Sequence, residues 1–330
     1  MDKVKISLTG VPVQNKIEFE QKNGGYGKVN WYVAESLKKL GYQLSIDDST
    51  ADVNFCCANP SWLQRRKNQY NIGYTTHEST QIIPDWQSGL DSMDEIWTMS
   101  HWIADSLSHY TDKVTTIVHP GVGSNFNPIP RTTEDKFYFL HTGEPADRKM
   151  GLLVFQAFVE EFGDNPDVVL VFKTQGPHRI VGANGFDNII FIGNDFTEEQ
   201  YAGLLSKMHC LVYPTLGEGG GMMPLEALAT GMPVISTWEW ADYKDFIHLK
   251  LDSVLTDIPE AIQQRTPLRG NGFLTTVESI REQMVKVYEN YEFYQNLYYN
   301  QSILIGSRYG WDKIVSDNAV PRLKELETLL

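Results

Sequence analysis

The segment Leu211–Thr237 reads LVYPTLGEGGGMMPLEALATGMPVIST and contains the most informative pattern in the chain. Its apolar start, residues 211–213, predicts a strand buried on both faces. Three glycines at 219–221 predict a loop, and Pro224 suits the first turn of a short helix that begins at or just before it. Residues 233–236, PVIS, predict a second buried strand. The loop therefore places a helix N-terminus at the carboxyl end of a strand.

Such a turn is suited to binding an anion. Glycines let a backbone approach a ligand closely, and the first N–H groups of a helix, together with its dipole, favour a phosphate. The backbone groups that would hold a donor phosphate here are those of Gly219, Gly220, Gly221, Met222 and Met223.

Two carboxylates flank this turn, Glu218 and Glu226, with seven residues between them. Carboxylates repel phosphates, so these two are better suited to accepting hydrogen bonds from the hydroxyls of a ribose and a sugar. A ligand with phosphates in the middle and hydroxyls at both ends is a nucleotide sugar. The alternative is structural: Glu226 as a favourable residue in a first helical turn, and the glycines as an ordinary loop.

Taken together, Glu218, the three glycines, Pro224, Glu226 and the GMPVIS run closely resemble the E-x7-E signature of retaining glycosyltransferases of family 4. The resemblance is strongest over Phe139–Thr237. It implies the GT-B fold, an α/β architecture of two Rossmann-like doubly wound domains that face each other across a cleft. It also implies that Glu218 faces the transferred sugar and Glu226 holds the nucleotide ribose.

Length and composition agree with two folded domains. The chain has 330 residues, of which 42% are hydrophobic and 12% aromatic, enough for two cores. No apolar run reaches the roughly 18 to 20 residues of a membrane span. The N-terminus begins a strand at once and lacks signal-peptide features. Three cysteines in apolar runs, Cys56, Cys57 and Cys210, are expected to be reduced, which favours a cytoplasmic location.

The net charge of −14 is unevenly distributed. Residues 1–130 contain 11 Lys and Arg against 14 Asp and Glu, and the remainder contains 17 against 28. An acidic chain is a poor general binder of phosphate backbones. The compact basic cluster Arg65-Arg66-Lys67 is expected to be the solvated face of a short helix.

The first half alternates strands and helices, which predicts a parallel sheet that binds ligands at the carboxyl ends of its strands. The expected strands are 4–11, 43–46, 52–58, 71–77, 95–99 and 114–119, and the expected helices are 28–40, 61–67 and 102–110.

Two places beyond strand ends are candidates for binding. The loop 23–27, NGGYG, precedes the first expected helix; a dinucleotide fingerprint is absent, and a flexible loop is the alternative. The resemblance places Gly24 and Gly25 where the acceptor domain meets the donor phosphate. His77 and Glu78 follow the strand 71–74, and the resemblance implies a role in acceptor binding or sugar orientation. A lone histidine is otherwise more often structural.

The polar, proline-bearing segment 128–135 predicts a boundary between domains. We expect an acceptor-binding domain at 1–130 and a nucleotide-sugar-binding domain at 131–310. The resemblance implies that a helix at 311–330 crosses back to the first domain.

The second domain opens with an expected strand, 137–143, before GEPADRKMG and an apolar helix, 152–162. The family usually has an Arg directly after the strand glycine and a Lys a few residues later, both binding the diphosphate. Lys149 matches that Lys, whereas Glu144 stands in place of the Arg. We therefore assign the second positive charge to Arg148. The alternative, an exposed pair at a helix start, is disfavoured because cations oppose the dipole there.

Further along, two strands supply donor contacts. Lys173 ends the expected strand 168–174, and Gly193 ends the strand 188–193, beyond which the family binds the nucleobase through backbone groups. Thr197 and Gln200 form a capping box, which is structural. Trp238, Trp240 and Asp242 are unranked candidates for the sugar pocket.

The leaving group of a nucleotide sugar is a diphosphate, whose charge is stabilised by a metal or by fixed cations and dipoles. The chain has no D-x-D motif, so we expect no metal and no cofactor. The resemblance implies transfer with retention, in which a phosphate oxygen takes the acceptor proton. The predicted function is a metal-independent retaining glycosyltransferase, hexosyl- or pentosyl-, that acts on a saccharide or glycoconjugate acceptor.

Three other classes remain as alternatives. The first is a non-catalytic nucleotide-sugar-binding protein, which the complete set of Lys149, Glu218 and Glu226 disfavours. The second is a Rossmann oxidoreductase, which lacks its fingerprint here. The third is a phage-type glycosyltransferase that acts on modified bases in DNA; the acidic charge disfavours it, and salt-dependent DNA binding would reveal it.

Overall fold

The computed structural model describes residues 3–10, 24–132, 136–143, 148–174, 176 and 180–330. The chain divides into two compact units. Unit 1 comprises residues 1–123 and 308–330, and unit 2 comprises Ser124–Ser307. The domain boundaries predicted from the sequence were after residues 130 and 310. Each unit is built on its own parallel sheet, so the expected α/β architecture is confirmed.

Unit 1 contains six parallel strands in the order β2-β1-β3-β4-β5-β6. Their bounds are β1 (Lys5–Gly10), β2 (Gln43–Ile46), β3 (Val53–Cys57), β4 (Tyr70–Tyr74), β5 (Glu95–Thr98) and β6 (Val114–Ile117). The central strands β3 and β5 are buried at every position. Burial on both faces favours apolar residues without alternation, and two of the polar exceptions, Asn54 and Glu95, are hydrogen-bonded to other side chains.

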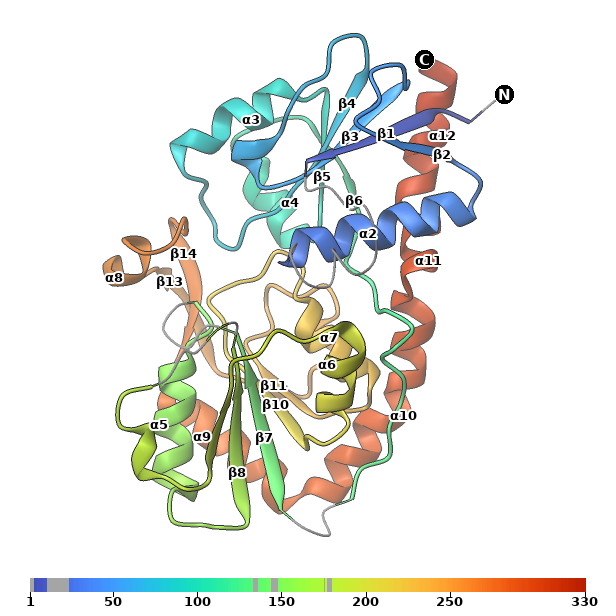
Figure 1. Cartoon of the computed structure of the whole chain (residues 1–330). Helices are drawn as coiled ribbons and strands as arrows, with labels where there is room; N and C mark the ends of the chain where they lie inside the picture. Colours follow the sequence, from blue (N-terminus) through green and yellow to red (C-terminus); the bar gives the residue numbers. More distant parts are fainter. Residues whose placement is uncertain (1–2, 11–23, 133–135, 144–147, 175, 177–179) are drawn as a thin grey trace. The chain divides into compact units, whose positions relative to one another are not determined.

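Helices cover both faces of this sheet (Figure 1). On one face lies α2 (Gly24–Lys39), and on the other lie α3 (Gln87–Ser92) and α4 (His101–Leu107). Short 3-10 turns at Pro60–Trp62 and Pro84–Trp86 connect the strands on the α3 side. The core on that side is the cluster Cys56, Ala58, Leu63, Ile82, Trp86, Leu90, Met93, Ile96, Ile103 and Leu107.

The C-terminal segment packs against α2 as part of unit 1. It consists of α11 (Trp311–Ile314), a π-helical turn (Val315–Ala319) and α12 (Val320–Leu329). Trp311 stacks on Tyr32 with ring centroids 5.1 Å apart. Farther along, the Arg322 guanidinium donates to the buried Glu95 carboxylate at 2.8 and 3.0 Å. A buried carboxylate needs such a partner, so this pair anchors α12 to β5.

Unit 2 contains six parallel strands in the order β12-β11-β10-β7-β8-β9. Their bounds are β7 (Phe137–Thr142), β8 (Val168–Lys173), β9 (Ile189–Ile192), β10 (Cys210–Tyr213), β11 (Val234–Ser236) and β12 (Leu249–Lys250). From β7 the chain adds β8 and β9 on one side and then returns to place β10 on the other. The point where the order reverses lies between β7 and β10, and ligands of such sheets bind at the carboxyl ends beside it.

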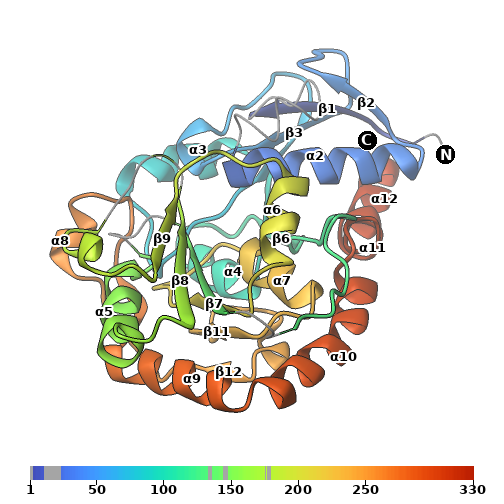
Figure 2. The same cartoon turned by 60° about the horizontal axis from the view of Figure 1, so that its bottom comes forward.

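The helices of unit 2 also lie on both faces of their sheet (Figure 2). One face carries α6 (Glu198–Leu205) and α7 (Met222–Ala229), and the other carries α5 (Gly151–Phe162) and α9 (Val277–Glu289). α10 (Tyr291–Tyr309) follows α9. An antiparallel hairpin, β13 (Ser253–Asp257) and β14 (Asn271–Thr275), encloses the short α8 (Glu260–Gln263).

Several local expectations are wrong in detail. The helix expected at 28–40 is α2, which begins at Gly24, so Gly24 and Gly25 form its first turn and not a loop before it. The short helix expected at 61–67 is limited to the 3-10 turn Pro60–Trp62, and Arg65 and Arg66 lie beyond it, paired with Asp94 and Asp47. The hairpin β13–β14 was not predicted at all.

Two positions in the glycine turn also differ from the prediction. α7 begins at Met222, so Pro224 occupies its third position and Glu226 its fifth, beyond the first turn.

The capping box of Thr197 and Gln200 at the start of α6 is confirmed. In the described part of the chain, no helix is long and apolar enough to cross a membrane.

Candidate functional site

The candidate donor site in unit 2 lies where the sheet order reverses. Residues 148–150 precede α5 on the β7 side, and residues 214–221 connect β10 to α7. A backbone hydrogen bond joins the two segments directly, because Leu216 N donates to Arg148 O at 2.9 Å. The side chains that follow two neighbouring strands are therefore held together, as the geometry of parallel sheets requires.

Arg148, Lys149 and Glu218 meet at this point. The Lys149 ammonium donates to Glu218 Oε1 at 2.5 Å, and the Arg148 guanidinium donates to the same oxygen. Lys149 and Glu218 are buried, with 8% and 6% exposure. The sequence prediction placed these three residues in one site, and the structure brings them into contact. Glu144, which takes the place of the usual family Arg, lies outside the described residues.

Tyr213 and Thr215 support this cluster from β10 and the loop after it. The Tyr213 hydroxyl donates to Glu218 Oε1 at 2.9 Å, and the Thr215 hydroxyl lies 3.1 Å from the same oxygen. The Lys149 ammonium also stands 4.1 Å from the centroid of the Tyr213 ring, within the range of a cation–π contact. The sequence analysis read Tyr213 only as part of a buried strand and so missed this contact.

The charges around Glu218 determine its protonation. Burial opposes ionisation of the carboxyl group, but Arg148 and Lys149 outweigh burial through charge and hydrogen bonds and lower the pKa of Glu218. Glu218 is therefore ionised at neutral pH. The cluster contains two positive side chains and one negative one.

The glycine turn ends in a tightly enclosed backbone. Gly221 has φ 64° and ψ 54°, the left-handed region that glycine adopts without strain. A Cβ at this position would overlap the Trp240 ring, and the Tyr243 hydroxyl donates to Gly221 O at 2.5 Å. Gly219 is buried, whereas Gly220, Met222 and Met223 are partly exposed. The N-terminus of α7 thus presents backbone N–H groups at a partly exposed edge.

Glu226 lies in α7 and is 2% exposed. A buried carboxylate of this kind needs polar partners.

Two other predicted donor contacts lie farther from the β7–β10 boundary. Lys173 ends β8, donates to Thr174 O at 2.7 Å and faces the Phe196 ring at 4.8 Å. Gly193 directly follows β9 and accepts a backbone hydrogen bond from Gly176 at 3.0 Å.

The β13–β14 hairpin supports the loop that carries Glu218. Phe273 N donates to Leu216 O at 2.7 Å, and Leu216 belongs to an apolar cluster with Met150, Ile258 and Leu268. A Cβ at Gly272 would lie 2.9 Å from the Leu216 Cβ, so only glycine allows this approach. The hairpin therefore holds the loop that carries Glu218 in place through Leu216.

In unit 1, Tyr26 joins the two predicted candidate regions. It lies one residue after Gly25 in the first turn of α2, and its hydroxyl donates to Thr76 O at 2.8 Å. Thr76 directly precedes His77 at the carboxyl end of β4. The glycines 24 and 25 and the segment 75–78 are thus neighbours. Tyr26 was not singled out by sequence, because a tyrosine between glycines has no distinctive pattern.

His77 is buried in an apolar environment. It is 3% exposed, its ring meets Trp86 edge-on at 6.2 Å, and neither ring nitrogen has a hydrogen-bond partner among the described residues. Burial lowers the pKa of His77 to about 4, so the ring is neutral at physiological pH. Glu78 is partly exposed. Of these two neighbours, Glu78 is the better placed to reach a ligand.

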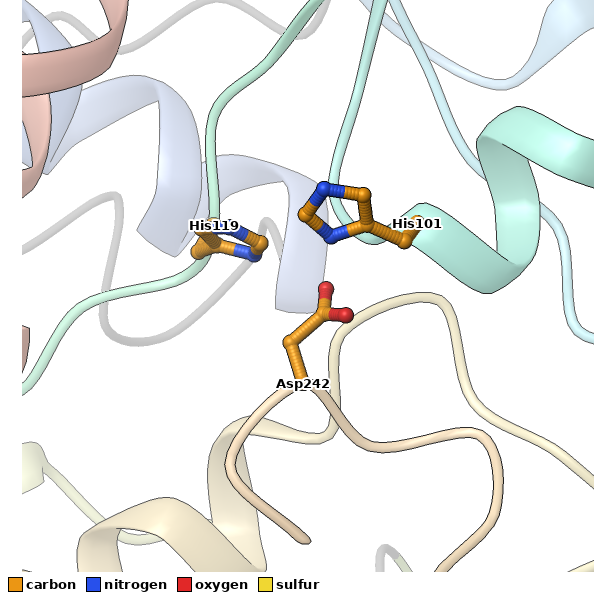
Figure 3. Close-up of side chains that lie close together, drawn as sticks. All are labelled: His101, His119 and Asp242. Atoms are coloured by element: carbon orange, nitrogen blue, oxygen red, sulfur yellow. The ribbon is translucent and has the colours of Figure 1, made fainter.

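A pair of histidines also lies in unit 1 (Figure 3). His101 begins α4 after β5, and His119 follows β6, with ring centroids 5.5 Å apart. Figure 3 also draws Asp242, a residue of unit 2. Two imidazoles are fewer ligands than protein metal sites normally use. We therefore assign no metal to this pair.

Two parallel six-stranded sheets with flanking helices define the GT-B class of fold. The structure is similar to the sucrose-phosphate synthase of Thermosynechococcus elongatus, with TM-score 0.71, 14% identity and coverage of 99% of this chain and 100% of that one. It is also similar to a glycosyltransferase of Rickettsia africae, with TM-score 0.65, 12% identity and coverage of 98% and 99%. A third similar structure is a pneumococcal O-GlcNAc transferase in complex with UDP and GlcNAc, with TM-score 0.57, 12% identity and coverage of 91% and 60%.

A family model matches part of the sequence. Residues 136–256 match the family described as Glycosyl transferases group 1. This segment contains Arg148, Lys149 and Glu218. A comparison with curated protein sequences found no match. The resemblance to group 1 glycosyltransferases with the GT-B fold is thereby confirmed.

Proposed function

We propose that this protein is a metal-independent retaining glycosyltransferase that moves a sugar from a nucleoside diphosphate donor to a hydroxyl of a saccharide or glycoconjugate. One observation carries the proposal. Arg148, Lys149 and Glu218 converge at the strand-order reversal of unit 2, within the segment that matches the glycosyltransferase family. Two cations beside a helix N-terminus are suited to a diphosphate.

The residues divide the donor between them. Lys149, Arg148 and the backbone N–H groups of Met222 and Met223 hold the diphosphate and stabilise its charge as the glycosidic bond breaks. Glu218 accepts hydrogen bonds from the sugar hydroxyls, and Glu226 accepts those of the ribose.

Two further contacts and one backbone approach complete the donor site. Lys173 contributes a third cation from the end of β8, and the backbone beyond Gly193 meets the nucleobase. The turn at Gly219–Gly221 lets the phosphates approach closely.

Unit 1 supplies the acceptor side of the reaction. Glu78 orients the acceptor or the sugar, and Gly24 and Gly25 at the start of α2 approach the donor phosphate. Because the pKa of His77 is about 4 and its ring is buried, His77 is a poor proton carrier at neutral pH. The acceptor proton therefore passes to a phosphate oxygen of the departing diphosphate, with the sugar transferred on the leaving-group side.

The nucleobase and location are narrower proposals. The similar pneumococcal enzyme was solved with UDP, which makes UDP the first nucleotide to test here. Three buried free cysteines, Cys56, Cys57 and Cys210, fit a reducing cytoplasm.

The test is a thermal-shift screen with UDP, GDP and ADP and their common sugars, with and without EDTA. A ligand at a hundred times its Kd adds about 2.7 kcal/mol of stability, which gives a measurable shift. Stabilisation by one nucleotide that EDTA leaves unchanged supports the proposal. No stabilisation by any nucleotide would refute the donor site. Turnover with the stabilising donor separates an enzyme from a binding protein, and NMR of the product anomer tests retention.

A DNA acceptor is the second candidate, because residues 1–130 are only slightly acidic. Binding to duplex DNA that weakens steeply with salt would favour it. Absence of binding at low salt would exclude it.

A further inference from the structure

Glu218 occupies the position of an anion between the two candidate phosphate-binding cations. Its Oε1 atom accepts from Lys149 at 2.5 Å, from Arg148, from the Tyr213 hydroxyl at 2.9 Å and from the Thr215 hydroxyl at 3.1 Å. Four donors converge on one carboxylate oxygen. In this state the protein's own carboxylate neutralises part of the charge that a diphosphate would meet.

The two ligands of a glycosyltransferase cycle differ in what they offer this carboxylate. A nucleotide sugar carries hydroxyl groups that can donate to it. The product nucleoside diphosphate has no such hydroxyls at that end, and its terminal phosphate ionises a second time near pH 6. On cations alone, the more highly charged product would bind more tightly than the donor.

Glu218 changes this order of affinities. To reach Lys149 and Arg148, a diphosphate must draw both cations away from a buried carboxylate, and a buried charge without partners is strongly destabilising. A sugar replaces the lost donors with its hydroxyls, whereas the product replaces none. The carboxylate therefore penalises the product more than the donor.

We propose that Glu218 is a specificity-determining residue that competes with the product nucleoside diphosphate for Lys149 and Arg148, so that the site releases product and favours donors with an intact sugar. This inference rests on the proposed function, which assigns the diphosphate to the same cations. It adds a role in product release that contact with the sugar alone would not give.

The experiment compares the wild type with Glu218→Gln, which keeps the side-chain size and removes the charge. Isothermal titration measures the Kd of UDP, GDP and ADP and of UDP-glucose, GDP-mannose and ADP-glucose. For the nucleotide that the wild type binds, Glu218→Gln is expected to lower the Kd of the diphosphate at least tenfold, which corresponds to about 1.4 kcal/mol. The Kd of the matching nucleotide sugar is expected to stay equal or to rise.

Glu199→Gln is the matched control, because Glu199 is an exposed residue of α6 and its replacement removes the same unit of charge. It is expected to leave both Kd values unchanged. An equal tightening in both variants would overturn the proposal, since long-range charge would then explain the effect.

The outcomes separate the two levels of the argument. If the wild type binds none of the three diphosphates, the proposed function fails. If it binds one and Glu218→Gln binds that diphosphate no more tightly, only the inference fails. Should Glu218→Gln not fold, Tyr213→Phe takes its place, because it removes one of the donors that hold Glu218. Glu218 then has one donor fewer when the cations leave it, so this variant is expected to bind the diphosphate severalfold more weakly. An unchanged or lower Kd would overturn the proposal.

Discussion

Replacing Lys149 by methionine tests whether its charge acts on a ligand or on the fold. Methionine keeps an unbranched side chain beside Gly143, where a Cβ would lie 2.9 Å from Lys149 Cγ. In the protein without ligand, the substitution removes the 2.5 Å contact with Glu218. Glu218 keeps Arg148, Tyr213 and Thr215 as donors, so its charge remains compensated.

The two expected magnitudes differ. Removing one partner of a buried ion pair costs about 3–5 kcal/mol when the other charge is left alone. Because three donors remain here, we expect the free energy of unfolding to fall by only about 1–2 kcal/mol. A hydrogen bond to a charged group contributes about 1.5–3 kcal/mol. If Lys149 holds the diphosphate in the transition state, kcat/KM for the donor should fall by roughly 10-fold to 150-fold.

The assay pairs donor turnover with urea unfolding. Lys207→Met is the control, because Lys207 is an exposed lysine after α6 whose loss removes the same charge. It should change neither quantity appreciably. An unchanged kcat/KM in Lys149→Met would refute a role for Lys149 in donor binding. A loss of stability above about 4 kcal/mol would show that the lysine is chiefly structural.

Three further predictions concern the scaffold around the site. Arg131 is buried and donates to Leu205 O, Met208 O, Ile129 O and Thr230 O at 2.8–3.1 Å. Arg131→Met removes all of these bonds, although Leu205 O and Thr230 O keep backbone donors, and it should lower the free energy of unfolding by about 3 kcal/mol; a loss below about 1 kcal/mol in urea unfolding would contradict this. Burial lowers the pKa of both His77 and His141 to about 4, so the unfolded chain binds more protons below its ordinary histidine pKa. Stability should be complete above about pH 6.5 and fall towards pH 4 by up to about 1.4 kcal/mol per pH unit for each histidine; equal slopes in the wild type and a His77→Gln, His141→Gln variant would refute it. Gly143 has φ 118°, and a Cβ at this position would lie 2.9 Å from Lys149 Cγ. Gly143→Ala should therefore displace Lys149 and raise the donor KM, and an unchanged KM would count against this prediction.

The central strands could be predicted from sequence because their burial is extreme. β3, β8 and β10 are buried at every position, and apart from Asn54 in β3 and the terminal Lys173 of β8 they are continuous apolar runs. The start of α2 could not be predicted, because glycines have low helix propensity. Tertiary contacts decide the conformation there: the Tyr26 hydroxyl donates to Thr76 O, which lies 50 residues away in sequence.

The hairpin β13–β14 was missed for a related reason. Val254 and Leu255 are largely exposed, so the strand has no buried face that would create an alternating pattern. The other strand of the hairpin, β14, contacts Leu216 through Phe273 and Gly272. A contact between segments so far apart leaves no local signal in either of them.

The residues of the candidate site could be predicted from sequence, but the ion pairs between them could not. The spacing of Glu218 and Glu226 and the basic pair 148–149 are visible in sequence. That both cations bind Glu218 follows from the adjacency of β7 and β10, which depends on the crossover of the whole sheet. The sequence predicted that Arg148 and Lys149 bind the diphosphate of a ligand. In the structure, both cations are already bound by the Glu218 carboxylate.

The most direct test of the central claim is a crystal structure of the protein with the nucleoside diphosphate that stabilises it. The account predicts that the diphosphate contacts Lys149, Arg148 and the N-terminus of α7, and that Glu218 has separated from both cations. A diphosphate bound elsewhere, with the ion pairs to Glu218 intact, would contradict it.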